Sequence, residues 1–148
     1  MPRKVRAAVI HAATDPRMQQ LVGEVDSALT GMGCKVAVTQ AAGAKAPDLA
    51  AADLVLLGSS PDGARPIHGD FTELLRELAG MTLAGRVVGA FSLDADSTLR
   101  SFREALEDCE VPLPDASFLK AGGATRAGDL AAWLRPLVQQ AEESARGR

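Results

Sequence analysis

The sequence predicts a three-layer α/β/α protein with a five-stranded parallel sheet in the order 2-1-3-4-5. Short apolar runs alternate with helix-periodic segments along the 148 residues, and this rhythm is typical of βαβ units, which form parallel sheets. The interior runs show no polar alternation, as expected for strands that are buried on both faces. A chain of this length suits one compact domain with a buried core.

The amino-terminal half begins with a buried strand, Val5–Ile10. Asp15-Pro16 then begins a helix, because aspartate can cap free backbone amides and proline fits the first turn. Gly31 or Gly33 ends this helix. The remaining elements expected in this half are a strand at Lys35–Thr39, a short helix at Pro47–Ala52 and an apolar strand at Asp53–Gly58.

The second half begins with a turn-rich loop, Ser59–Pro66. The elements expected after it are a helix from near Asp70 to Leu78, a strand at Arg86–Phe91, a helix at Ser97–Cys109, a strand at Ala116–Lys120 and a helix from about Ala127 toward Glu142. Pro136 is expected to kink the last helix, and residues 144–148 to fray, so the predicted domain comprises residues 1–143.

Composition limits the classes of function. The net charge of −3 argues against a general nucleic-acid surface, which needs a basic field. No apolar run approaches the roughly 18 residues of a membrane-spanning helix. The first apolar stretch is interrupted by His11 and Asp15, so we expect no secretory signal and a cytoplasmic location. Cys34 and Cys109 allow free thiols, which are usual in that compartment, or one disulfide.

The predicted strand order also locates a binding site. In a 2-1-3-4-5 sheet, ligands bind beyond the carboxyl ends of strands 1, 3 and 4, where the winding direction switches. The loops that follow these strands are His11–Arg17, Gly58–Gly69 and Phe91–Ser97.

Several segments together resemble the short-chain flavodoxins over nearly the whole chain. Val5–Leu21 has the family's strand, polar loop and helix, and Phe118–Leu137 its last strand, glycine and long helix. Ala52–Ser60 is similar to the acidic residue, apolar strand and Gly-Ser of the third strand, and Leu83–Phe91 to the lead-in of the fourth. The resemblance implies a flavodoxin-like fold, non-covalent FMN binding and electron transfer to a redox partner protein, without catalysis.

The first loop departs from the flavodoxin pattern Ser/Thr-x-Thr-Gly-x-Thr, whose hydroxyls and amides hold the FMN phosphate. In the matching segment, Ala13–Met18, only Thr14 keeps a hydroxyl, and Pro16 replaces the glycine and removes an amide donor. Asp15 places a carboxylate where the phosphate would lie, at a cost on the order of 1–4 kcal/mol. FMN binding is therefore expected to be weakened or lost.

The flavin ring has also lost its usual aromatic neighbours. Gly58–Gly69 contains no aromatic side chain except His68, and Ser92–Ser97 contains none. A stacked ring is worth about 0.5–1.5 kcal/mol beyond burial, so its loss weakens binding further. The cofactor contacts that the resemblance implies are Thr14 and Arg17 near the phosphate, Ser59, Ser60 and Gly63 in the second loop, and Ser92, Leu93 and Asp94 in the third.

Two other functions remain open on the same scaffold. One is a flavin-free module that binds a small ligand or a protein at this edge. The other is a metal site or hydrolase that uses His11, Asp15, Asp62, His68, Asp94 and Asp96. Helix caps, turns and solvated histidines explain those residues more simply. A phospho-accepting receiver is rejected, despite Lys120, because strand three ends in Leu57-Gly58-Ser59 without an aspartate.

Overall fold

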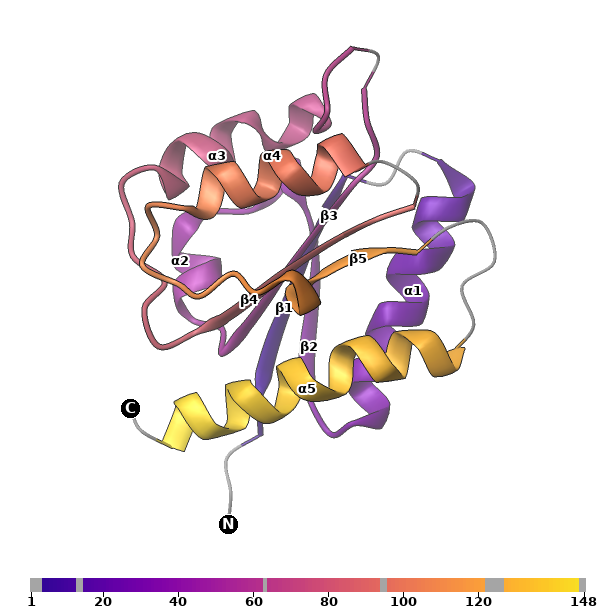
Figure 1. The fold of residues 1–148 in the computed structure, drawn as a ribbon, viewed down its shortest axis with the longest axis vertical. Helices are drawn as coiled ribbons and strands as arrows, with labels where there is room; N and C mark the ends of the chain where they lie inside the picture. The colour runs from indigo at the N-terminus through magenta and orange to yellow at the C-terminus, as the bar shows by residue number, and fades with distance from the viewer. Residues whose placement is uncertain (1–3, 13–14, 63, 94–95, 122–126, 147–148) are drawn as a thin grey trace.

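The computed structural model describes residues 4–12, 15–62, 64–93, 96–121 and 127–146. The chain folds into the predicted five-stranded parallel sheet, ordered β2-β1-β3-β4-β5 (Figure 1). The strands are β1 (Arg6–Ala12), β2 (Lys35–Gln40), β3 (Leu54–Ser59), β4 (Val87–Ser92) and β5 (Phe118–Lys120). This is the flavodoxin-like α/β fold that the sequence predicts.

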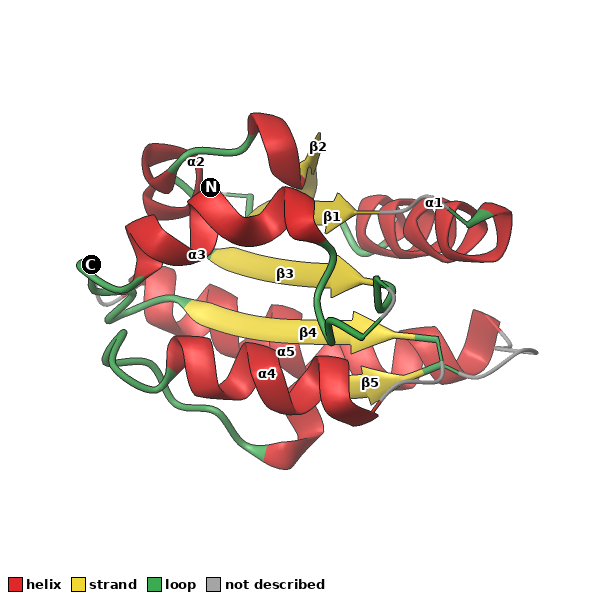
Figure 2. Cartoon of the chain, turned by 90° about the horizontal axis from the view of Figure 1, so that it is seen from above, coloured by secondary structure: helices red, strands yellow, loops and turns green. Residues whose placement is uncertain are grey.

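Helices cover both faces of the sheet. The α-helices are α1 (Pro16–Gly31), α2 (Ala46–Ala50), α3 (Thr72–Leu78), α4 (Asp96–Leu106) and α5 (Ala127–Arg146). Three short 3₁₀ turns accompany them, η1 (Ala41–Gly43), η2 (Gly69–Phe71) and η3 (Asp115–Ser117). Helices α1 and α5 pack on one face, and α2, α3 and α4 on the other (Figure 2).

The core therefore has two halves, one on each side of the sheet. Alternate residues of a strand point to opposite faces. On the α1/α5 side, Val9, Leu56 and Phe91 pack against both helices. On the other side, strand residues such as Ile10 and Leu57 contact α3 and α4. Every residue of β3 and β4 is buried, which explains why these two strands are continuously apolar.

The parallel register brings the strand ends together. His11 on β1 pairs with Gln40 on β2 and Gly58 on β3, and Gly58 in turn pairs with Phe91 on β4. The carboxyl ends of β3 and β4 consequently lie at one edge of the sheet (Figure 2). The loops that the sequence analysis selected leave from this edge.

Two predicted helix ends were wrong. Helix α5 continues through Pro136 to Arg146, past the expected end near Glu142, so residues 144–146 are helical instead of frayed. Helix formers fill this segment, and the buried Ala141 keeps it packed on the core. Helix α4 ends at Leu106 and not at Cys109, in a turn where Glu110 has a φ of 59°. The domain boundary at residue 143 stays a prediction.

Trp133 and the two cysteines lie in the buried core. Trp133 is buried in the α1/α5 core, where it packs edge-on against Phe91 with ring centroids 6.0 Å apart. Cys34 and Cys109 are free thiols, and both are buried.

Candidate functional site

The start of α1 is closed by Asp15. This residue is the N-cap, and its Oδ1 accepts a hydrogen bond of 2.8 Å from the backbone N–H of Arg17. Pro16 occupies the first helical position and has no N–H to offer. The Arg17 guanidinium lies 3.7 Å from the other carboxylate oxygen of Asp15. The Arg17 amide at this helix end is therefore already bonded within the chain, whereas the exposed Arg17 guanidinium is only a weak partner for the Asp15 charge. Thr14, the other predicted phosphate contact, lies outside the described residues.

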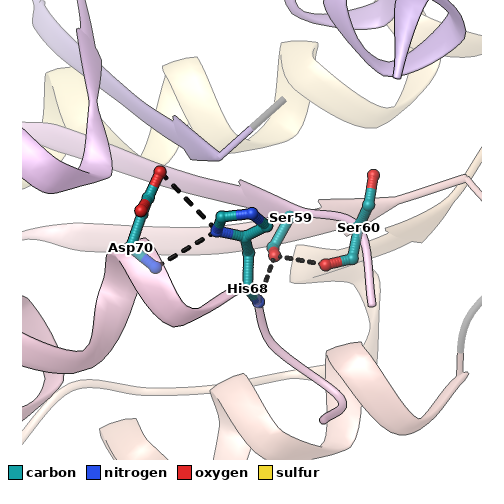
Figure 3. A network of polar contacts seen from close by, with 4 residues as sticks. All are labelled: Ser59, Ser60, His68 and Asp70. Carbon is teal, nitrogen blue, oxygen red and sulfur yellow. Dashed lines mark hydrogen bonds and ion pairs between the residues drawn. The ribbon is translucent and has the colours of Figure 1, made fainter. Parts of the chain in front are cut away.

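Ser59 closes the second loop on itself. Its side chain is fully buried, its Oγ donates to the carbonyl of Ser60 at 2.8 Å, and the same Oγ accepts the backbone N–H of His68 at 3.0 Å (Figure 3). The hydroxyl predicted to contact a ligand thus holds the two ends of the loop together. The Ser60 side chain does not take part in this bond, and Gly63 lies outside the part of the chain that the structure describes.

The rest of the second loop is also bound to the body of the protein. Asp62 and Arg65 exchange two backbone hydrogen bonds of 2.9 Å, which form a tight turn. The buried Thr98 hydroxyl in the first turn of α4 donates to the carbonyl of Pro66. These described contacts fix the loop without any ligand.

His68 caps the turn that precedes α3. Its Nδ1 accepts the backbone N–H of Asp70 at 3.1 Å and lies 3.6 Å from the Asp70 carboxylate (Figure 3). With Nδ1 as the acceptor, the neutral ring carries its proton on Nε2. A Ser–His–Asp relay needs the opposite tautomer, with Nδ1–H toward the carboxylate. In this arrangement His68 caps the turn that leads into α3.

The third loop begins at Ser92, whose side chain is fully buried. Its carbonyl accepts the N–H of Ala121 at 2.8 Å, whereas its Oγ has no hydrogen-bond partner among the described residues. Leu93, predicted as a cofactor contact, is buried in the core on the α1/α5 side. Asp94 lies outside the described ranges.

His11 is half-buried at the end of β1, and was expected to be solvated. Its Nδ1 is buried and has no partner in the described part of the chain, and this burial lowers the pKa of the imidazole. Beside it in the sheet, Gly58 lies under the Phe91 ring: a Cβ there would come within 2.3 Å of the ring. The sequence analysis missed this close approach, for which the glycine within an apolar strand was the available signal.

The predicted metal ligands do not assemble among the described residues. No group of three or more histidine, cysteine, aspartate or glutamate side chains there could share an ion. Asp96 instead pairs with Lys120 at 3.2 Å.

Among the residues that the structure describes, no helix is long and apolar enough to cross a membrane.

Solved flavodoxin structures match this fold along nearly the whole chain. A short-chain flavodoxin associated with a non-canonical PDU bacterial microcompartment is 18% identical, with a TM-score of 0.75, 95% of this chain covered and 99% of that chain. For oxidised flavodoxin 2 from Bacillus cereus the identity is 19%, the TM-score 0.75 and the coverages 93% and 98%. A Fusobacterium nucleatum flavodoxin variant bound to flavin mononucleotide is 11% identical, with a TM-score of 0.69 and coverages of 89% and 94%.

These likenesses establish a shared fold, since the identities are low. No family model matches the sequence, and no curated protein matches it either.

Proposed function

We propose that this chain is a flavodoxin-like protein, resembling the FMN-dependent electron-transfer proteins, in which FMN binding is weakened or lost. The observation that carries the proposal is the Asp15 cap at the start of α1. Flavodoxins of known structure include one that is bound to flavin mononucleotide, so the fold itself accommodates this cofactor.

The phosphate of FMN carries a negative charge, and a helix N-terminus binds phosphate through free amides and a favourable dipole. Asp15 competes with the phosphate for the amides and the dipole of this helix end. Its carboxylate accepts the Arg17 amide and places a negative charge where the phosphate would bind. At about 4 Å this repulsion is worth on the order of 1–4 kcal/mol. The partial compensation by Arg17 is small, since that side chain is 60% exposed and 3.7 Å from Asp15.

The second and third loops also offer few groups that could bind the flavin ring. The Ser59 hydroxyl is committed to Ser60 and His68, and the Leu93 side chain faces the core. His68 is the one aromatic side chain of the second loop, and its Nδ1 is engaged by Asp70. Of the predicted contacts in these loops, the described Ser92 keeps a buried hydroxyl without a partner.

A flavin-free module that binds a small ligand or a protein at this edge is the alternative. The observation that favours it is the second loop, which hydrogen bonds of Ser59 and Thr98 hold in place. A loop that is already ordered loses little conformational entropy when it binds a small ligand or a protein. In either case we propose a carrier or binding module and not a catalyst, because the Ser59 hydroxyl bonds the backbone N–H of His68 and not its imidazole, so the two do not form a nucleophile–base pair.

The test is an absorption spectrum of the purified protein, followed by a titration with FMN that records flavin fluorescence. We expect colourless protein and little quenching. The double variant Asp15→Thr, Pro16→Gly removes the carboxylate and restores an amide donor, so it should bind FMN at least about fivefold more tightly.

Asp26→Thr is the matched control, because it removes one negative charge from the exposed surface of the same helix, away from its start. This variant should not change FMN binding. Yellow protein, or quenching by the parent with a sub-micromolar midpoint, would overturn the proposal. An unchanged affinity in the double variant would show that Asp15 does not block the phosphate.

A further inference from the structure

A cavity lies at the amino-terminal edge of the sheet, opposite the candidate FMN site. It has a volume of about 450 Å³ and lies where β1 begins, where the α1–β2 turn passes and where α5 ends. The start of β1 and the end of α5 lie side by side there (Figure 1). Ordinary small-molecule sites have volumes of about 300–1,000 Å³, so this cavity is large enough for one.

The inner wall of the cavity is apolar. Val5 and Cys34 belong to the buried core on the α1/α5 side, and Met32 is packed against that core. Ala145 on α5 completes the wall. Burial and the nearby Glu142 carboxylate both raise the pKa of the Cys34 thiol. The thiol therefore stays protonated and acts as an apolar surface, not as a nucleophile.

Three exposed charged side chains, Lys4, Glu142 and Arg146, line the same cavity. None of them makes an ion pair within the described ranges, although Arg17, Arg76, Arg103 and Lys120 all do. Two cations and one carboxylate thus line a partly apolar hollow, so the net charge of its lining is positive. The Glu142 carboxylate helps to raise the pKa of the Cys34 thiol, so it lies near the apolar wall.

We propose that this cavity binds a small organic anion with an apolar body, of the medium-chain carboxylate class. The hydrocarbon part would lie against Val5, Met32, Cys34 and Ala145, and the carboxylate would be held by Lys4 and Arg146. Glu142 would repel the anionic group and so direct it toward the two cations. The site is at the opposite edge of the sheet from the candidate FMN site, so it does not depend on the function proposed above.

The experiment is an NMR titration of the ¹⁵N-labelled full chain with octanoate. We expect backbone shifts at Val5, Gly33, Cys34 and Ala145, and no saturable binding of octylammonium, which has a similar chain but the opposite charge. Lys4→Gln and Arg146→Gln should each raise the octanoate Kd about three- to tenfold. Glu142→Gln should lower the Kd, because it removes a like charge.

Arg100→Gln is the matched control, since it removes one exposed cation from α4, whereas the cavity is lined by β1, the α1–β2 turn and α5. It should leave the Kd unchanged. Arg146 also lies in the last turn of α5, where a cation stabilises the helix end, so the unfolding temperature of each variant is measured in parallel. If Arg146→Gln unfolds the protein, Lys4→Gln and Glu142→Gln still test the site with opposite signs.

The proposal fails if octylammonium binds as tightly as octanoate, because the hollow would then select only for hydrocarbon. It also fails if Glu142→Gln weakens octanoate binding, or if the shifts appear at the carboxyl edge of the sheet instead. Absence of any saturable shift with octanoate would overturn it outright.

Discussion

Replacing Gly58 with alanine tests the close approach between β3 and the Phe91 ring. An added Cβ would lie 2.3 Å and 2.4 Å from Phe91 Cζ and Cε2. Optimal carbon–carbon contacts are about 3.5–4.0 Å, so the ring must move by more than roughly 1 Å. Phe91 is fully buried and packs edge-on against Trp133, which leaves no free space into which the ring could turn.

Overpacking of this kind costs about 1–3 kcal/mol. For a chain of this size, each kcal/mol lowers the unfolding temperature by about 2–4 °C, so Gly58→Ala should lower it by about 2–12 °C. Gly23→Ala is the control. Gly23 lies in α1 with nothing within 4 Å of the added Cβ, and alanine there should stabilise the protein by about 0.5–1 kcal/mol.

Thermal and urea unfolding, both followed by the fluorescence of Trp133, the single tryptophan, give the unfolding temperature and the free energy of unfolding of both variants. Because Trp133 contacts Phe91, Gly58→Ala should also shift the native emission, whereas Gly23→Ala should not. The decisive measurement is a double-mutant cycle with Phe91→Leu, whose shorter side chain leaves room for the new methyl group. We expect a coupling of at least about 1 kcal/mol. If Gly58→Ala costs as much in the Phe91→Leu background as in the parent, the reasoning is refuted.

Two further predictions concern titration. Burial lowers the pKa of His11 from 6.5, so as the pH falls the unfolded chain binds the proton first and stability is lost below about pH 6.5. His11→Leu should flatten the dependence of the unfolding temperature on pH between 7 and 5, and an unchanged slope would contradict this. Burial raises the pKa of the Cys34 and Cys109 thiols, so a thiol reagent at pH 8 should label the denatured chain fully and the native chain slowly. Rapid labelling of the native protein would contradict that burial.

The fold could be predicted because its signals are local. The apolar runs Leu54–Leu57 and Val87–Ala90 read as buried strands without any tertiary information, and the structure confirms both. Asp15-Pro16 was recognised as a helix start because capping depends only on adjacent residues. The end of α4 was placed too late, because the turn at Glu110 has a left-handed backbone that a glutamate does not indicate.

The hydrogen bonds and burial of the site residues could not be predicted in the same way, and their contact with a cofactor stays a prediction. Ser59 and Leu93 both follow apolar strands and were expected to contact a cofactor. The structure shows Ser59 bonded to His68, nine positions along the chain, and Leu93 in the core. Thr98, whose partner Pro66 is 32 residues away, gave no signal at all in the sequence. Such pairings depend on how loops and helices pack, which the pattern of a single chain does not specify.

The two edges of the sheet differ in which of their polar side chains are bonded within the protein. At the carboxyl edge, the carboxylate of Asp15 and the hydroxyls of Ser59 and Thr98 are all bonded within the described chain. A site that must hold a dianion is expected to leave its donors available, because every bond to the ligand otherwise requires breaking one inside the protein. At the amino edge, Lys4 and Arg146 remain unpaired among the described residues beside an apolar hollow. At the carboxyl edge, the buried Ser92 Oγ and His11 Nδ1 also have no partner among the described residues, so each edge keeps polar groups that could bind a ligand.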